Sequence, residues 1–377
     1  MNDKENKETM KKILVFGRPY SNGGDFLIYD RMVKVLKAFS PECCIELNLD
    51  SDARFQMAEL NEYDAIVTGG GGAQYAETYV RTSFFYQHID ELSVPIHYMG
   101  TGLYGADGED ETLYEYRYSD DIVAYFNKVI ERGGQLASRD WVVDTILRNN
   151  GVKGVIMAGC PAWYDLALLE RPEDDVVFRE NFAGKEIRSI AISNHGLTKN
   201  AQDHEKKLRQ IKELIVFLQK IFPGTEMLLT FNDGYITKYS RNYNLTLQEW
   251  AVEHRVKCVD LSGDAEKFRV LDGIDLHIGF RVHTHIYCIS KMIPSLLIEE
   301  DIRGYGMNET LCLPHIRAYA EHSKPDDFIA NPYLNVQLSM LLEQMRVQRR
   351  IDYGEVFRVI RKCYENGMQA WLTNVMK

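Results

Sequence analysis

The feature that most constrains the fold is a repeated alternation of short apolar runs with segments of helical periodicity. The apolar runs of the first half cover residues 13–17, 44–49, 64–68, 95–99, 135–138 and 155–157. Those of the second half cover residues 187–192, 225–231, 256–259 and a run that starts at residue 275. Short apolar strands separated by helices are typical of parallel sheets, because parallel neighbours need a long crossover connection. The alternation therefore predicts two doubly wound α/β domains.

An acidic, loop-like segment over residues 171–185 separates the two alternations. We place the first domain at residues 1–180 and the second at residues 181–334. Residues 335–377 have helical spacing without intervening strands. We expect these helices to brace the pair and to pack back on the first domain. Ligands of doubly wound sheets lie outside the carboxyl ends of the strands, so a cleft is expected where the two sets of strand ends face each other.

Charge and cysteine content narrow the class of partner. The chain has 377 residues, a net charge of -11 and seven cysteines without a C-x-x-C pair. An acidic balance argues against nucleic-acid binding, although a local cationic pocket for a small anion is compatible with it. The cysteines indicate free thiols in a reducing compartment and no zinc ribbon. The polar N-terminus lacks a signal-peptide core, and no apolar run approaches the ~20 residues that span a bilayer. We expect a cytoplasmic protein, at most peripheral at the inner membrane face.

The run from residue 275 to 303 carries the strongest functional signal. It predicts a strand, a tight turn, a helix and a second strand, with Arg281 and His283 where the turn enters the helix. A helix N-terminus offers unpaired N–H groups and partial positive charge, so it suits a phosphate or carboxylate. Arginine binds such groups through a planar pair of donors, and histidine transfers protons near neutral pH. The alternative is that Arg281 forms an interdomain salt bridge and His283 caps the helix.

Two glycine-rich loops follow strands of the first domain. Asn22-Gly-Gly-Asp25 precedes a helix predicted over residues 26–39, and four consecutive glycines occupy 69–72. The first loop departs from G-x-G-x-x-G. We expect Asn22, Asp25, Gly70 and Gly71 to line the cleft, because glycine allows a ligand to approach backbone N–H groups closely. The alternatives are that Asp25 merely caps the helix and that the glycines relieve crowding at the end of a strand.

Three further cationic residues follow predicted strands, and we include them as substrate-binding candidates. Arg139 has the alternative of pairing with Asp140 at a helix terminus. His195 has the alternative of an exposed loop histidine. Arg303 has the alternative of a surface ion pair with a carboxylate among residues 299–301.

Other chemistries find little support in the sequence. His283 and His285 stand two apart, so a helix would point them to different faces, and no metal site is predicted. His285 is more simply a packed or hydrogen-bonded helix residue. Cys160 precedes a proline and is better explained as a buried thiol than as a nucleophile. Neither a G-x-S-x-G elbow nor a P-loop occurs.

The order of these motifs resembles the polysaccharide pyruvyl transferase family. The residues that carry the resemblance are Asn22–Asp25, 64–72, 138–140, 158–161, 279–283, Pro294 and Arg303. Together they span roughly residues 13 to 305. Each motif alone is weak, and their order and spacing are the more specific signal. The segment 193–196 departs from the family's arginine-containing loop.

The resemblance implies a GT-B-like fold and transfer of pyruvate from phosphoenolpyruvate to a sugar as a cyclic ketal, in the synthesis of cell-surface polysaccharide. It implies no cofactor or metal, and an acceptor that is a sugar or a lipid-linked oligosaccharide. Arg281 and His283 match the family's Arg-x-His motif, which is associated with phosphoenolpyruvate. Our hypothesis makes His283 the general acid, Arg281 the anion holder and Asp25 the acceptor of a hydroxyl proton. The alternatives are a GT-B glycosyltransferase that uses a nucleotide sugar, and a non-catalytic glycan- or anion-binding protein.

Overall fold

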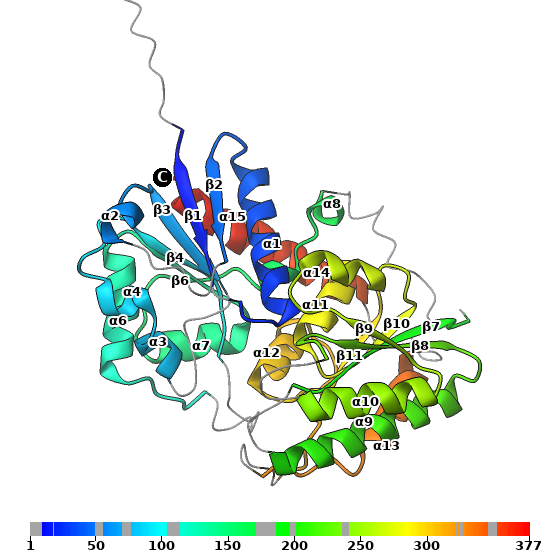
Figure 1. The fold of residues 1–377 in the computed structure, drawn as a ribbon. Coiled ribbons are helices and arrows are strands. Elements are labelled where there is room, and N and C mark those ends of the chain that lie inside the picture. Colours follow the sequence, from blue (N-terminus) through cyan, green and yellow to red (C-terminus); the bar gives the residue numbers. More distant parts are fainter. Residues whose placement is uncertain are drawn as a thin grey trace, which may run out of the picture.

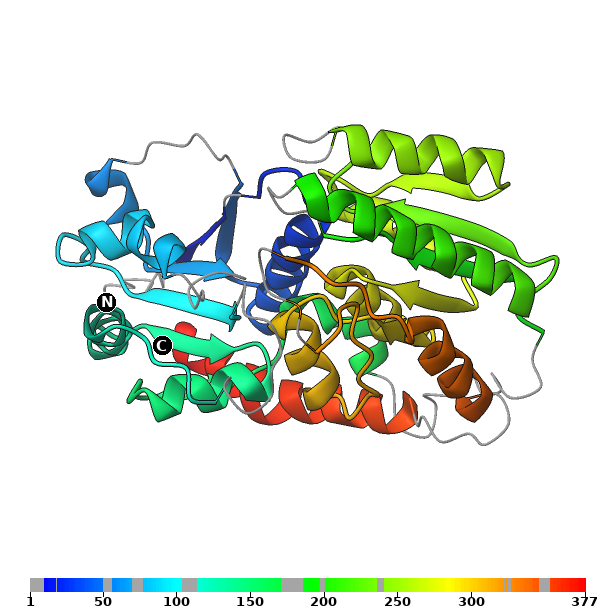
Figure 2. The same ribbon diagram turned by 90° about the horizontal axis from the view of Figure 1, so that it is seen from below.

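The fold consists of two parallel sheets with helices on their faces, which confirms the predicted pair of doubly wound α/β domains (Figures 1 and 2). The computed structural model describes residues 10–17, 19–49, 56–69, 77–103, 114–170, 186–196, 201–235, 241–321, 323, 327–345 and 353–377. The acidic segment predicted to link the domains, 171–185, lies outside these ranges. Within them, no helix has the length and apolar character that crossing a membrane requires.

The first sheet has the strand order β2-β1-β3-β4-β5-β6, and every pair in it is parallel. Its strands are β1 (Lys12–Phe16), β2 (Cys44–Asn48), β3 (Ala65–Gly69), β4 (Ile96–Thr101), β5 (Gln135–Ser138) and β6 (Val155–Met157). Its helices are α1 (Gly23–Phe39), α2 (Met57–Leu60), α3 (Thr78–Arg81), α4 (Phe84–His88), α6 (Asp120–Glu131), α7 (Trp141–Asn149), the 3₁₀ turn η1 (Pro161–Trp163) and α8 (Leu166–Leu169).

The second sheet has the order β11-β10-β7-β8-β9 and is also parallel throughout. Its strands are β7 (Ser189–Ser193), β8 (Glu226–Phe231), β9 (Lys257–Asp260), β10 (Leu276–Gly279) and β11 (Ser295–Leu297). The helices are α9 (Ala201–Ile221), α10 (Arg241–Glu253), the 3₁₀ helix η3 (Ala265–Leu271), α11 (Val282–Ser290), α12 (Ile302–Thr310) and α13 (Leu334–Glu343).

Each sheet reverses its strand order beside its first strand. In the first sheet the reversal lies between β1 and β3, and in the second it lies between β7 and β10. Helices connect to opposite faces on the two sides of such a point, so the loops part and leave a crevice beyond the carboxyl ends of the strands. The loop after β10 begins with Phe280 and Arg281. The topology therefore places the Arg281 region at the switch point of the second domain.

The C-terminal helices connect the two domains. The helix α14 (Tyr353–Cys363) begins beside β11, where the Tyr353 hydroxyl donates to the carbonyl of Ser295 at 2.9 Å. The chain continues through a π-helical turn (Tyr364–Met368) into α15 (Gln369–Val375), which packs on the first sheet. The Asn374 amide donates to Gln135 of β5 at 3.3 Å. Figure 2 shows these last helices, in red, passing beneath both domains.

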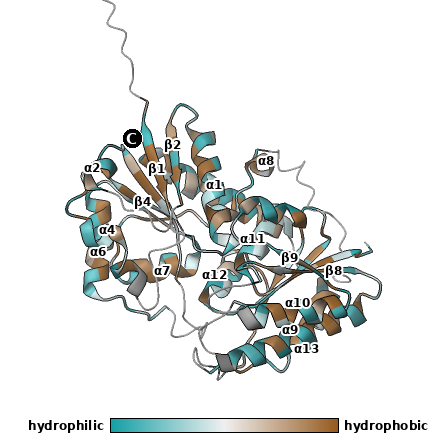
Figure 3. Ribbon diagram, in the orientation of Figure 1, coloured by the Kyte–Doolittle hydropathy of each residue, from teal (hydrophilic) through white to brown (hydrophobic). Residues whose placement is uncertain are grey.

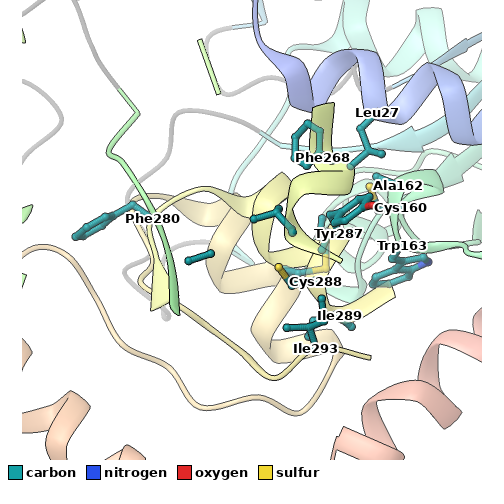
Figure 4. Packing of buried hydrophobic residues seen from close by; sticks show 14 of the residues in the cluster. Leu27, Cys160, Ala162, Trp163, Phe268, Phe280, Tyr287, Cys288, Ile289 and Ile293 are labelled. Atoms are coloured by element: carbon teal, nitrogen blue, oxygen red, sulfur yellow. The ribbon is translucent and has the colours of Figure 1, made fainter. Parts of the chain in front are cut away.

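A hydrophobic cluster joins the two domains. Apolar residues gather on the strands and on the inner helix faces, while polar residues cover the outside (Figure 3). One cluster of buried side chains continues from the first domain into the second, and a second cluster lies within the first domain and against α12. Figure 4 shows the junction, where Leu27 of α1 and Trp163 of η1 lie near Phe268 of η3 and Tyr287 of α11. A continuous apolar interface of this kind fixes the orientation of the domains, whereas small polar interfaces permit hinge motion.

Candidate functional site

The N-terminus of α1 packs against the second domain. The helix begins at Gly23, three residues earlier than predicted, and its N-cap is Asn22, whose side chain accepts from the backbone N–H of Gly24 at 2.9 Å. The alternative that Asp25 caps this helix is therefore wrong, because Asp25 lies inside the first turn. The backbone N–H of Gly23 donates to the carbonyl of Asn232, just after β8, at 2.8 Å. One of the helix's orphan donors is thus satisfied by the other domain.

Gly23 and Gly24 allow α1 to pack this closely against the second domain. A Cβ at Gly23 would overlap the carbonyl oxygen of Leu261, and a Cβ at Gly24 would overlap the imidazole of His283. Glycine is required here because two backbones and an aromatic ring approach each other without room for a side chain. The close approach that we expected for a ligand is made by the second domain.

Arg281 and His283 lie where the sequence predicted, at the entrance to α11. Arg281 occupies the N-cap position, and its backbone N–H donates to Ser193 Oγ at 3.0 Å. Its guanidinium pairs with the carboxylate of Asp233. Asp233 belongs to the second domain, so this ion pair lies within one domain. His283 is in the first turn and not at the cap, and its buried Nε2 has no hydrogen-bond partner among the residues that the structure describes.

These side chains surround a small recess. The predicted residues that line it are Asn22, Arg281, His283 and Arg303. The further lining residues include Asn232, Phe280, Glu300 and Asp301. The enclosed space is about 20 Å³, which is room for one water molecule. The recess is thus compact, polar and formed by both domains.

Arginine side chains dominate the electrostatics around His283. Burial, followed by the charges of Arg303, Arg139 and Arg281, lowers the pKa of His283 to about 3. Desolvation and neighbouring cations both oppose protonation of an imidazole. The ring is therefore neutral at pH 7, and the predicted role of His283 as a protonated general acid does not fit these surroundings. A neutral imidazole is still a donor at one nitrogen and an acceptor at the other.

Asp25 has the better-matched pKa for proton transfer. Burial raises the pKa of this carboxyl group from 3.8 to about 6, although the positive charges of Arg303 and Arg281 act in the opposite direction. Asp25 was predicted to line the cleft, but it is not among the residues that line the recess. Its carboxyl group lies in the first turn of α1, within electrostatic reach of both arginines. A group with a pKa near the working pH is suited to act as an acid in one step and as a base in another.

Arg303 and Arg139 each form an ion pair with a carboxylate, as the alternative interpretation of each residue had proposed. Arg303 donates to Asp301 through Nε at 3.0 Å and Nη2 at 2.6 Å. Arg139 is buried and donates to Asp140 at 3.1 Å through Nη2, while Asp140 also caps α7. Arg303 lines the recess, whereas Arg139 acts on His283 only through its charge. Ion pairing thus positions these cations beside the imidazole.

His195 is not the exposed loop residue of our alternative. It is fully buried, its ring stacks on Phe280 with centroids 3.6 Å apart, and its Nδ1 lies 2.8 Å from Glu300 Oε1. Burial lowers the pKa of His195 to about 4, against the effect of Glu300. Burial alone would raise the pKa of Glu300, but Lys207 and His195 outweigh it and hold that pKa at about 2. His195 does not line the recess, so it orients Glu300 and is not a substrate contact as we predicted.

Gly70 and Gly71, which we predicted to bind substrate, lie outside the described residues. The sequence argument missed Asn232, Asp233 and Glu300, all of which follow the carboxyl ends of strands β8 and β11. We selected Arg281 because it follows the carboxyl end of a strand. The same criterion would have identified these three residues, had we applied it to neutral polar and acidic side chains as well.

A buried polar network lies behind Arg281. His277 Nε2 is 3.0 Å from Ser193 Oγ, and His277 Nδ1 is 2.7 Å from Ser295 Oγ. His285 Nδ1 lies 2.7 Å from the same hydroxyl. Ser193 accepts from the Arg281 backbone, so the network fixes the turn between β10 and α11. Over the described ranges, no group of three metal-ligating side chains is close enough to hold an ion.

Comparison with known proteins identifies the fold. No family model matches the chain, and no curated protein sequence matches it. Solved structures do match over nearly the whole chain. The chain has a GT-B-like fold.

Three of the similar structures show how far the likeness extends. The complex of S. aureus MnaA with UDP has a TM-score of 0.51 at 11% identity and covers 94% of this chain and 96% of its own. The UDP-GlcNAc 2-epimerase from Neisseria meningitidis bound to UDP-GlcNAc has a TM-score of 0.50 at 13% identity and covers 94% and 98%. The UDP-N-acetylglucosamine 2-epimerase from Rickettsia bellii has a TM-score of 0.50 at 10% identity and covers 97% of each chain. At these identities the likeness establishes the fold alone.

Proposed function

We propose that the protein is a group-transfer enzyme that acts on a sugar and binds a small, phosphate-bearing donor in the recess between its domains. The observation that carries this proposal is the cluster of Arg281, Arg303 and Arg139 around His283, a neutral imidazole whose Nε2 has no hydrogen-bond partner among the described residues. The N-terminus of α11 reaches the same place. Arginine donors and helix N-termini together are the arrangement that proteins use for phosphates and carboxylates.

The donor that fits this cluster best is phosphoenolpyruvate, and the reaction is pyruvyl transfer. The molecule carries a phosphate and a carboxylate, so it uses several cationic groups in a small volume. The recess of about 20 Å³ must widen for either donor, and it has to widen less for phosphoenolpyruvate than for a nucleotide sugar. The motif resemblance from residue 13 to 305 supports the same choice, because it includes Arg281 and His283.

In this mechanism Asp25 supplies the proton and the arginines hold the anion. A proton moves from Asp25 to the methylene carbon of the donor, which makes C2 electrophilic. A sugar hydroxyl adds to C2 and gives its proton to the Asp25 carboxylate, which restores the acid. Phosphate leaves, and a second hydroxyl closes the cyclic ketal and gives its proton to the phosphate. The products are the ketal and inorganic phosphate, so atoms and charge balance. Arg281 and Arg303 stabilise the negative charge on the departing phosphate, and His283 hydrogen-bonds it.

A nucleotide-sugar enzyme is the second candidate. The structures of S. aureus MnaA and the N. meningitidis epimerase contain UDP and UDP-GlcNAc, respectively, and share this chain's fold. The diphosphate group of a nucleotide sugar would also contact the positively charged side chains at the switch point of the second domain. The recess would then have to open further than phosphoenolpyruvate requires, in order to admit a nucleoside. Of the two candidates, this one is favoured by structural likeness and the first by the composition of the site.

The test is release of inorganic phosphate from phosphoenolpyruvate in the presence of a panel of sugars and lipid-linked oligosaccharides. We expect acceptor-dependent release by the wild type and a loss of about 100-fold or more in Asp25→Asn, within the range of general acid–base contributions. Lys220→Gln, an exposed change at the end of α9, should leave the rate unchanged. Binding of phosphoenolpyruvate without turnover on any acceptor would favour a non-catalytic binding protein. Turnover of UDP-sugars alone would establish the second candidate.

A further inference from the structure

A second and larger cavity lies between the domains, away from the recess. It has a volume of about 430 Å³ and is bounded by α1, the segment that joins η1 to α8, η3 and α11. Cavities of about 300–1,000 Å³ are typical of small-molecule sites. Leu27 of α1 and Tyr287 of α11 line it from opposite domains, and Figure 4 shows both side chains at the junction.

The cavity is rich in positive charge although the chain as a whole is acidic. Its cationic residues are Arg31, Lys34, Lys37, Arg269 and Lys291. Its carboxylates are Asp30, Asp165 and Glu266. The whole chain has a net charge of -11, so an excess of cations at one interdomain cavity is a local reversal of sign. Such a reversal attracts anionic small molecules.

Arg31 is the anchor of this cluster. It is only 7% exposed, and its Nη1 donates to the carbonyl of Tyr164 at 2.8 Å and lies 3.5 Å from Asp165. Lys291 also pairs with Asp165, at 2.5 Å, so one carboxylate is shared between two cations. The buried Nε of Arg31 has no hydrogen-bond partner within the described part of the chain. A buried donor attached to a charge is costly to leave unpaired, and an anionic acceptor in the cavity would satisfy it.

We propose that this cavity binds a small molecule with two or more negative charges, such as a phosphate ester or a polycarboxylate. Its anionic group lies among Arg31, Lys34 and Arg269. Its remaining part lies against the apolar side chains of Leu166, Ala167 and Ala265, which also line the cavity.

The position of the cavity links it to the recess. On α1, Asp25 lies near the recess and Arg31 lies in the cavity, six residues further on, which is roughly 9 Å of helix. On α11, His283 lines the recess, while Tyr287 and Lys291 line the cavity. A ligand that contacts both helices holds Asp25 and His283 in one relative position. Occupancy of the cavity is therefore expected to strengthen anion binding in the recess.

The test is calorimetric titration with inorganic pyrophosphate and, in a separate arm, citrate. The two probes distinguish a phosphate source from a carboxylate source of the same charge. The cavity variant is Lys34→Gln/Lys37→Gln/Arg269→Gln, which changes rim positions and leaves Arg31 and its pairing with Asp165 intact. The matched control is Lys212→Gln/Lys220→Gln on α9. Arg303→Gln weakens binding in the recess by about tenfold or more, so titration of this variant reports mainly on the cavity.

We expect at least one probe to bind Arg303→Gln and the α9 control with the wild-type affinity for the cavity. Combining the cavity substitutions with Arg303→Gln should weaken this binding by tenfold or more. Undiminished binding in that combined variant would overturn the proposal, as would the absence of binding by either probe to Arg303→Gln. These measurements need neither donor nor acceptor, so their failure would leave the proposed enzymatic activity intact.

Discussion

Asp25 illustrates how the surroundings of one residue bear on both stability and chemistry. The burial of its carboxyl group raises its pKa to about 6, and two arginines reduce that effect without cancelling it. In the unfolded chain the same group ionises near 3.8. A group whose folded pKa is raised contributes stability that is full below the unfolded pKa and is lost as pH rises through the folded pKa. At pH 8 the ionised Asp25 is therefore a cost to the folded state.

We expect Asp25→Asn to be more stable than the wild type at pH 8 and nearly equal to it at pH 4. The pKa difference of about two units corresponds to at most about 3 kcal/mol at pH 8. Loss of the favourable contact between an acidic residue and the α1 N-terminus opposes this by about 0.3–1 kcal/mol, so the gain dominates. Urea denaturation at the two pH values measures the difference. A variant that is less stable at pH 8 would contradict the argument.

His283 gives a second prediction at this scale. Because burial and three arginines keep its pKa at about 3, its ring resonances are expected to stay constant between pH 5 and 8. An added phosphate brings negative charge to the arginines and should raise this pKa, so the same resonances should then titrate. NMR of labelled histidines, assigned with His283→Ala, provides the measurement. A titration near pH 6.5 without any anion would show that the ring is solvated instead.

At the scale of elements, the contact between α1 and the second domain determines the shape of the recess. The helix donates a backbone hydrogen bond to Asn232 and lies against the carbonyl of Leu261. A second contact lies on the opposite side, where Gly306 of α12 packs on Asp140 at the start of α7. The same α12 carries Arg303 in its first turn. Both contacts therefore position residues that surround His283.

Gly23→Ala tests the contact between the N-terminus of α1 and the second domain. The added methyl group overlaps the Leu261 carbonyl, so α1 must shift, and we expect a loss of about 1–3 kcal/mol in unfolding free energy, as for other overpacked sites. Phosphate binding in the recess should weaken as well. Gly273→Ala is the matched control, because a Cβ there has no atom within 4 Å among the described residues. Equal stabilities of the two variants would show that the contact between α1 and the second domain has room for a methyl group.

For the whole molecule, the continuous core predicts that both domains unfold together. The cluster at the junction includes Leu27, Trp163, Phe268 and Tyr287. The helix α14 contacts the second sheet, and α15 contacts the first. Separation of the domains would expose this apolar surface to water at about 25 cal/mol per Å². Scanning calorimetry is expected to show one cooperative transition with equal calorimetric and van't Hoff enthalpies. Two resolved transitions would mean that the domains are independent.

The sequence predicted the parts of this molecule that depend on local pattern. Alternating apolar runs located the strands, and the strand-end rule placed Arg281, His283 and Arg303 at one recess. Features that depend on distant segments were not accessible. Asn22 and Asp25 are both good N-caps, and the choice follows from a hydrogen bond to Asn232 on another domain. The burial of His195 results from stacking on Phe280, which follows a different strand. The pKa values of Asp25 and His283 likewise depend on packing between domains.

The central claim is that the recess binds a small phosphorylated carboxylate, and calorimetric titration with phosphoenolpyruvate tests it most directly. We expect saturable binding to the wild type and to Lys220→Gln. Arg303→Gln should bind about tenfold or more weakly, because it loses a charge-assisted contact worth about 1.5–3 kcal/mol. UDP should not compete. Binding of UDP without binding of phosphoenolpyruvate, or equal affinities of the wild type and Arg303→Gln for phosphoenolpyruvate, would contradict the account.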